Sequence, residues 1–227
     1  MSAYGELKAL GASATARTTS LDANLELLRR SVDPAVARRA AVLILFGNLD
    51  DHPADFRSAG VPADLDVLLV ERAATLNDHP GQVAFPGGSL DAGDAGPEAA
   101  ALREAREETG LDPDGVVVLG TLPEVGLPVS NFLVTPVLGW WDRPTPVDVV
   151  DYGESASVFR VPVADLLNPE NRRTAVLSHG TRTHRSPAFL VQGVLVWGFT
   201  GIILNAVLEE LGWNLPWDED REVVPEL

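Results

Sequence analysis

The chain contains no cysteine and is poor in basic and aromatic residues. Its 227 residues include 17 Lys and Arg against 33 Asp and Glu, and 6% are aromatic. Without cysteine there are no disulfide bonds and no thiol catalysis. The net charge of −16 argues against a nucleic-acid backbone as the main partner, because such binding depends on Lys and Arg. No apolar run is long enough to cross a membrane, and the opening MSAYGELKAL lacks the basic-then-apolar order of a secretory signal. We therefore expect a cytoplasmic protein that contacts neither nucleic acid nor membrane.

What is present is the composition of a globular protein, with 45% hydrophobic and 22% charged residues. A chain of this length is expected to form one catalytic domain with short extensions. We predict an N-terminal arm and helical extension over residues 1–35, frayed over residues 1–20, a main domain over residues 36–215 and a tail over residues 216–227. The sequence is compatible with a homodimer but does not determine the oligomeric state.

Hydrophobic periodicity and turn residues divide the chain into strands and helices. Helices are predicted over residues 25–28, 36–40, 97–109, 162–167 and 199–211, and strands over residues 40–46, 66–72, 82–85, 116–122, 132–141, 158–161, 174–177, 188–191 and 194–197. Pro86-Gly87-Gly88 is expected to turn, and Ser178–Ser186 is expected to form a basic loop. Because strands and helices interleave without a strict βαβ rhythm, we predict one α+β or α/β domain with a mixed sheet between helices.

The predicted helix over Pro97–Thr109 is short and very acidic. Proline suits the first helical position, and Gly110 suits the left-handed residue that closes a helix. Glu104, Glu107 and Glu108 fall on one face at helical spacing, where their like charges repel one another. A divalent cation would relieve this repulsion, and Mg²⁺ and Mn²⁺ prefer oxygen ligands.

The run Arg103–Leu111, REAREETGL, resembles the second half of the Nudix box, G-x5-E-x7-R-E-U-x-E-E-x-G-U, in which U is a bulky aliphatic residue. The first half departs from this pattern: counted from Gly88, Asp94 stands in place of Glu, one extra residue precedes Arg103, and Ala105 is small for its U position. Upstream, residues 68–88 resemble the signature LLTxRSx3Rx3GxVxFPGG of the coenzyme A pyrophosphatase branch, with differences at Val70, Ala73 and Asn77.

This resemblance implies a Nudix-type α/β/α sandwich that hydrolyses the phosphoanhydride of a small-molecule diphosphate with the help of Mg²⁺ or Mn²⁺. It implies metal ligation by Glu107, Glu108 and the Gly88 carbonyl, with Glu104 as a further ligand or as an acceptor that orients water. Gly87, Gly88 and Arg72 are the implied substrate contacts, and Arg103 is expected to hold a glutamate in position by a forked hydrogen bond.

Two functions fall to residues outside the Nudix box. Glu154, at the end of a loop and just ahead of a strand, is our candidate for the general base, with Glu124 as the second candidate. No acidic residue occurs between Glu170 and Glu209, and the basic residues there include Arg182 and Arg185. Because a forked Arg recognises phosphate well, these two arginines are candidates for binding the 3′-phosphate of coenzyme A.

The sequence thus predicts hydrolysis of coenzyme A or its acyl derivatives to 3′,5′-ADP and phosphopantetheine. One alternative is a Nudix hydrolase of another substrate, such as a nucleotide sugar, a dinucleotide or a nucleoside triphosphate. A second alternative is a Nudix-fold ligand-binding regulator without turnover, which the intact acidic cluster disfavours. A solvated acidic helix face would account for the glutamates but not for the glycine-rich stretch before them.

Overall fold

The computed structural model describes residues 2–16, 19–21, 25, 28–49, 53–75, 81–128, 130–179 and 182–225, without the side chains of His179 and Arg182. The predicted helix over residues 25–28 lies partly outside this described part of the chain. The helices there are α1 (Ala3–Thr15), α3 (Pro97–Thr109), α4 (Val163–Leu167) and α5 (Gly198–Glu210), with short 3₁₀ turns η1 (Pro113–Gly115) and η2 (Pro169–Asn171). None of the described helices has the length and apolar content of a membrane span.

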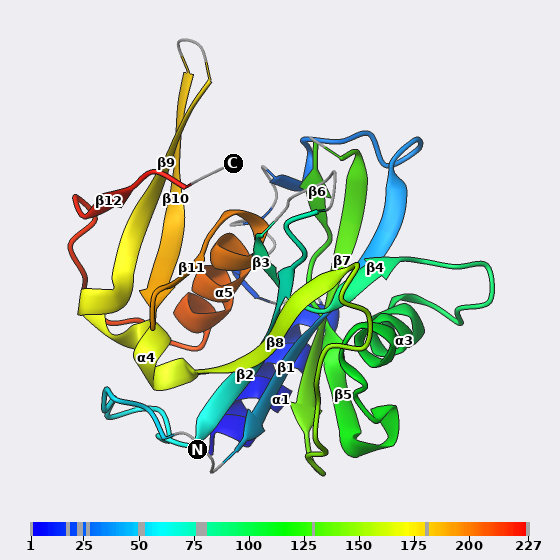
Figure 1. Cartoon of the computed structure of the whole chain (residues 1–227), viewed down its shortest axis with the longest axis horizontal. Coiled ribbons are helices and arrows are strands. Elements are labelled where there is room, and N and C mark those ends of the chain that lie inside the picture. The colour runs from blue at the N-terminus through cyan, green and yellow to red at the C-terminus, as the bar shows by residue number, and fades with distance from the viewer. Residues whose placement is uncertain are drawn as a thin grey trace.

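A mixed main sheet forms the centre of the molecule (Figure 1). Its strands are β1 (Arg38–Asn48), β2 (Leu65–Arg72), β3 (Val83–Ala84), β4 (Gly87–Ser89), β5 (Val116–Thr121), β6 (Val125–Leu127), β7 (Phe132–Trp141) and β8 (Ser155–Pro162). On one side β1 pairs in parallel with β7. On its other edge, β1 pairs with two antiparallel strands. Its first part pairs with β4, where Ala40 faces Ser89, and its last part pairs with β2, where Phe46 faces Val67.

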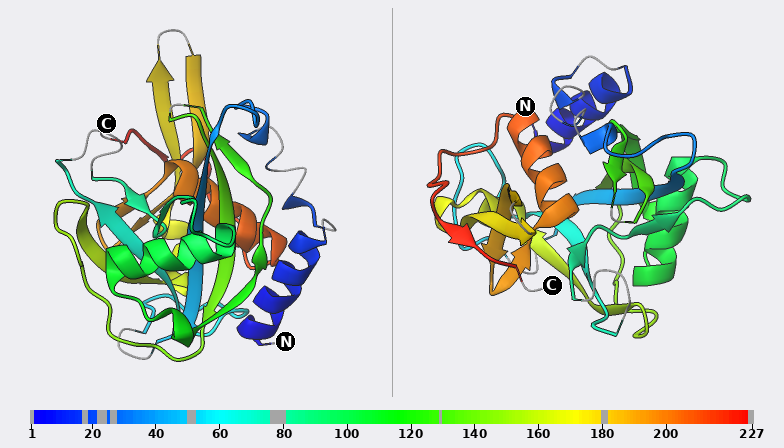
Figure 2. Two further views of the ribbon diagram at one scale, coloured as in Figure 1. Left: turned by 90° about the vertical axis from the view of Figure 1, so that its right-hand side faces the viewer. Right: turned by 90° about the horizontal axis from the view of Figure 1, so that it is seen from above.

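Helices cover both faces of this sheet, because β1 is apolar on both sides. Leu43 and Leu45 belong to the core under α3, whereas Ile44 and Phe46 belong to the larger core that includes α1 and α5. Figure 2 shows α3 on one side of the sheet and α1 and α5 on the other. The predicted α/β/α sandwich with a mixed sheet between helices is confirmed.

The strands predicted over residues 174–177, 188–191 and 194–197 form a second sheet beside α5, and not part of a single mixed sheet. Its strands, in spatial order, are β11 (Val194–Val196), β10 (Arg182–Val191), β9 (Arg172–His179) and β12 (Glu222–Val223). The expected basic loop over residues 178–186 is wrong, because β9 and β10 run on as an antiparallel hairpin to the pair His179 and Arg182. Thr183, His184 and Arg185 are exposed there, so this part of the hairpin has no buried face to produce the alternation that marks a strand in sequence.

The N-terminal residues are ordered into α1, so the expectation of a frayed arm over residues 1–20 is wrong. Ser2 caps the helix by accepting a hydrogen bond from the Gly5 amide at 3.2 Å, and Leu7 is fully buried. Gly11 lets the helix approach β5, since a Cβ there would lie 2.4 Å from the Leu119 carbonyl oxygen.

Two further local predictions fail for tertiary reasons. The predicted helix over residues 36–40 is a turn that leads into β1 at Arg38, with the Ala37 amide bonded to the Asp33 carbonyl at 2.9 Å. The turn predicted at Pro86-Gly87-Gly88 is in part a strand. Gly87 and Gly88 begin β4, because pairing with β1 holds their backbone in an extended conformation.

Candidate active site

The acidic helix α3 has the predicted bounds and packs closely on the main sheet. It begins at Pro97 and is closed by Gly110, which has a left-handed φ of 71° and donates its amide to the Arg106 carbonyl at 2.9 Å. Ala101 and Ala105 are fully buried against the sheet. The small Ala105, a departure from the Nudix pattern, therefore lies where helix and sheet meet.

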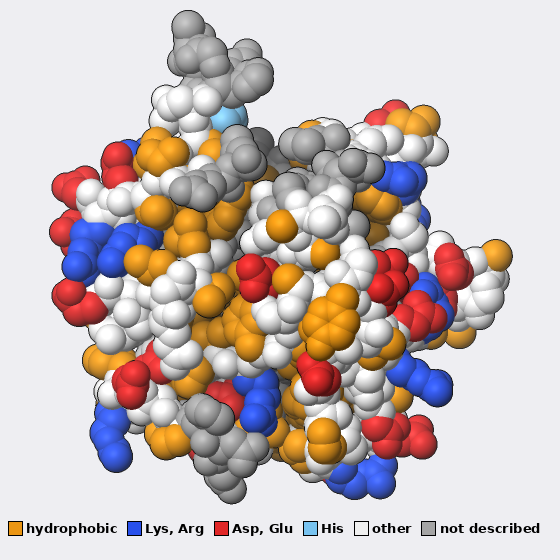
Figure 3. Space-filling model, in the orientation of Figure 1, with side chains coloured by type: hydrophobic (Ala, Val, Ile, Leu, Met, Phe, Trp, Pro, Cys, Tyr) orange, Lys and Arg blue, Asp and Glu red, His pale blue; other side chains and the backbone are white. Residues whose placement is uncertain are grey.

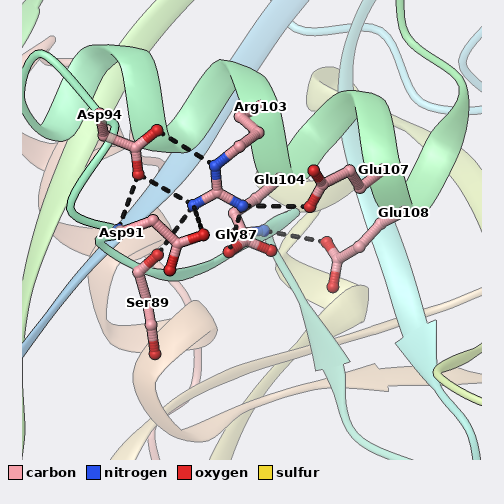
Figure 4. Close-up of polar contacts among 8 residues, drawn as sticks. All are labelled: Gly87, Ser89, Asp91, Asp94, Arg103, Glu104, Glu107 and Glu108. Carbon is pink, nitrogen blue, oxygen red and sulfur yellow. Dashed lines mark hydrogen bonds and ion pairs between the residues drawn. The ribbon is translucent and has the colours of Figure 1, made fainter.

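The two glycines of β4 let this strand pass directly beneath the glutamates. A Cβ on Gly88 would lie 2.6 Å from the carboxylate of Glu104, and a Cβ on Gly87 would lie 2.4 Å from the Ala41 carbonyl oxygen. Gly87 also donates its amide to Oε2 of Glu108 at 2.9 Å (Figure 4). Gly87 is thus required by close approach to the backbone of β1, whereas a side chain at Gly88 would displace the Glu104 carboxylate.

Arg103 joins two of the glutamates to the loop that precedes α3 (Figure 4). Its Nη1 donates to Glu104 at 2.9 Å and to Glu107 at 3.0 Å. Its Nη2 donates to the Ser89 carbonyl at 3.0 Å and to Asp94 Oδ2 at 2.9 Å, and its Nε donates to Asp94 Oδ1 at 3.1 Å. The guanidinium thus makes the predicted forked contact, but the fork falls on Asp94 rather than on a glutamate.

Asp94 is the site residue that the sequence analysis treated only as a departure from the Nudix pattern. Its carboxylate is 7% exposed and also accepts the Asp91 amide at 2.8 Å. The hydrogen bond from Arg103 lowers the pKa of Asp94, and the same contact raises the pKa of Arg103. The signal that could have identified this contact is the position of Asp94 where the Nudix pattern has Glu.

Glu108 is the most buried of the three glutamates, at 8% exposed. Burial raises its pKa to about 7. The hydrogen bond from Gly87 and the charge of Arg72 lower the pKa, whereas the charges of Glu104 and Glu154 raise it further. Burial also raises the pKa of Glu104, against the hydrogen bond from Arg103. A positive charge near these carboxylates would favour their ionised forms.

Arg72 and Glu154 both lie close enough to α3 for their charges to act on Glu108. Arg72 ends β2, and its Nε is buried without a hydrogen bond among the described residues. The carbonyl of Glu154 accepts the Ala73 amide at 2.9 Å, which ties the end of the loop before β8 to the end of β2.

The remaining predicted site residues are not brought into this cluster. Glu124 pairs with Arg39 at the start of β1. Arg185 lies on β10 and pairs with Glu222 of β12, in the second sheet, which lies on the opposite side of the molecule from α3 in Figure 1. The side chain of Arg182 lies outside the described residues.

The donor groups beside α3 fit a hard divalent cation, because such cations prefer oxygen ligands. The donors are the carboxylate oxygens on one face of the helix and the backbone carbonyl of Gly88, which lies next to Glu104. No three Asp, Glu or His side chains of the described residues are already arranged as metal ligands. Arg103 bridges Glu104 and Glu107 instead, while Glu108 turns to the Gly87 amide. Figure 3 shows acidic side chains, with a basic one among them, gathered over the position of α3.

Comparisons with known proteins identify the family of the chain. The sequence matches the NUDIX domain family over residues 57–179. It is 40% identical over 146 residues to NudL of Cronobacter sakazakii, described as an uncharacterized Nudix hydrolase, covering 64% of this chain and 75% of the relative. NudL of an Enterobacter species is 38% identical over 149 residues, with the same coverage. The crystal structure of the Nudix hydrolase RenU from M. smegmatis is 27% identical and covers 56% of this chain and 71% of its own, with a TM-score of 0.42.

The fold and the acidic helix define a hydrolase of acid anhydrides in phosphorus-containing compounds. The chain belongs to the Nudix hydrolase family. Enzymes of this family generally use divalent ions such as Mg²⁺ or Mn²⁺.

Proposed function

We propose that the protein hydrolyses the diphosphate linkage of coenzyme A or its acyl derivatives, giving 3′,5′-ADP and phosphopantetheine. The main support is the cluster of Glu104, Glu107 and Glu108 above the glycines of β4, with Arg72 close enough for its charge to act on Glu108. The upstream run from Leu68 to Gly88 supports coenzyme A as the substrate, through its similarity to the signature of that branch.

Mg²⁺ or Mn²⁺ would be held by the three glutamates and the Gly88 carbonyl. When bound, the cation supplies charge neutralisation at the diphosphate and activation of a water molecule. Arg103 positions Glu104 and Glu107, since one guanidinium contacts both carboxylates and is itself fixed by Asp94. The Gly87 amide holds Glu108 in the same way.

Arg72 and Glu154 would act on the substrate itself. Arg72 would attract the diphosphate through its positive charge, which also acts on Glu108. Glu154 accepts the proton of the water that attacks phosphorus, and the bond from that phosphorus to the bridging oxygen breaks. Its charge is felt at Glu108, whereas Glu124 is paired with Arg39, so Glu154 stays the first candidate for the base.

A panel of diphosphates tests this function by product mass and kcat/KM. Coenzyme A should give 3′,5′-ADP and phosphopantetheine with a higher kcat/KM than ADP-ribose or a diadenosine polyphosphate. Glu107→Gln should lose divalent-dependent turnover, while Glu98→Gln, on an exposed position of the same helix, should keep it. A higher kcat/KM on another diphosphate would reject coenzyme A but leave the phosphoanhydride chemistry standing.

Recognition of the 3′-phosphate by Arg182 and Arg185 is a separate part of the proposal. Arg185 is 47% exposed in its pair with Glu222, so a phosphate could compete for its guanidinium. The double variant Arg182→Ala, Arg185→Ala should reduce the preference for coenzyme A over its 3′-dephospho form. An unchanged preference would remove both arginines from the substrate site.

A further inference from the structure

One aromatic ring is exposed on the loop that ends at Glu154. Tyr152 is 71% exposed and is the only exposed aromatic side chain among the described residues. The other tyrosine, Tyr4, packs edge-on against Trp140 with ring centroids 5.2 Å apart. No hydrogen bond or ring contact involves the Tyr152 side chain within the described part of the chain. Val150, two residues earlier, is also exposed at 59%.

The backbone holds this ring at the edge of the site. Tyr152 lies at the tip of a tight turn in which Asp151 accepts the Glu154 amide at 3.1 Å through its carbonyl and the Gly153 amide at 2.7 Å through Oδ1. The turn is attached on one side to α3, where Val150 donates to the Glu108 carbonyl at 3.3 Å.

The other side of the turn is attached to β2, because the Ala73 amide donates to the Glu154 carbonyl at 2.9 Å. Tyr152 therefore stands between the helix that carries Glu108 and the strand that carries Arg72. The exposed ring is thus carried by the segment that joins the two elements of the proposed site.

We propose that Tyr152 is a specificity residue that stacks on the nucleobase of the substrate. The inference rests on the proposed function in one respect, which is that the substrate is a nucleoside diphosphate derivative. An aromatic ring suits a base because every base has a flat π face, and stacking needs no hydrogen-bonding partner on the protein.

Calorimetric titration with two non-hydrolysable probes tests this inference without turnover. One probe is α,β-methylene-ADP, which carries the base, and the other is methylenediphosphonate, which does not; both are titrated in the presence of Mg²⁺. Tyr152→Ala should weaken binding of α,β-methylene-ADP by about 5- to 20-fold. This is the lower end of the range for base–aromatic stacking, which we expect because the ring is exposed. Binding of methylenediphosphonate should stay unchanged, and Tyr152→Phe should bind both probes like the wild type.

The remaining outcomes separate stacking from other roles. An equal loss of affinity for both probes would mean that Tyr152 maintains the shape of the turn and does not stack on the base. No loss of affinity for either probe would overturn the proposal. A wild type that does not bind α,β-methylene-ADP would overturn it as well. Val117→Ala, a truncation of an exposed residue on β5, is the matched control and should change neither affinity. If coenzyme A is not hydrolysed but the base-dependent loss is observed, stacking stands and only the substrate proposal fails.

Discussion

Replacing Glu108 by glutamine should make the metal-free protein more stable at alkaline pH. Burial raises the pKa of this carboxyl from 4.5 to about 7, so the folded state binds the proton more tightly than the unfolded state does. The wild type then loses stability as the pH rises from about 4.5 through 7, because a buried group must ionise. Glutamine stays neutral, and its side-chain oxygen can still accept the Gly87 amide.

The size of the effect follows from the pKa difference. At about 1.4 kcal/mol per pH unit, the advantage of Glu108→Gln should grow by about 2 to 3 kcal/mol between pH 5 and pH 8. Urea unfolding in EDTA measures this difference, with Glu98→Gln on the same helix as the control that should not change with pH. Added Mg²⁺ should stabilise the wild type more than Glu108→Gln. A variant that is less stable than the wild type at pH 8 in EDTA, or a difference that does not depend on pH, would refute the reasoning.

Three further changes test other parts of the structure. Gly88→Ala should weaken Mg²⁺ binding and lower kcat/KM more than 10-fold, because the new Cβ would lie 2.6 Å from the Glu104 carboxylate; wild-type kinetics would mean that β4 can shift away. Arg103→Lys keeps the charge but not the fork, so Mg²⁺ affinity measured by calorimetry should fall about 10- to 100-fold. Leu7→Ala should lower the free energy of unfolding by about 2 to 5 kcal/mol in urea, whereas a frayed N-terminal arm would show no change.

Elements with strong local signals could be predicted from the sequence. Helix α3 has a proline at its start, a closing glycine and helix-forming residues between them, and its predicted bounds are those observed. The apolar runs of β1, β2 and β7 were likewise predicted to within two residues. In these segments local preference and tertiary packing favour the same structure.

Elements that depend on distant contacts could not be predicted. The helix α1 is rich in small residues with weak periodicity, and its burial comes from packing on β5 and β7. The short strand β4 contains two glycines, which favour a turn locally, and becomes a strand because it pairs with β1. The exposed end of the β9–β10 hairpin is polar on both faces, so its sequence reads as a loop.

The same distinction applies to the site. The glutamates, the glycine pair and Arg103 are close in sequence, so their spacing alone predicted a cluster. The contact of Asp94 with Arg103 depends on how the loop after β4 folds back along the helix, which the spacing does not determine. Arg72 and Glu154 are 82 positions apart in the chain, and hydrogen bonding between Ala73 and Glu154 joins their segments.

The three glutamates are not equivalent, although their spacing on α3 makes them look so. Glu104 and Glu107 share the guanidinium of Arg103, and Glu107 is also 58% exposed, so both have a counter-charge without a metal. Glu108 is 8% exposed and has only the Gly87 amide and the charge of Arg72 to favour its ionised form. The gain from a bound cation should therefore be greatest at Glu108. Arg103 stabilises Glu104 and Glu107, and the cation would complete the charge balance at Glu108, where the charges of Arg72 and Glu154 also act.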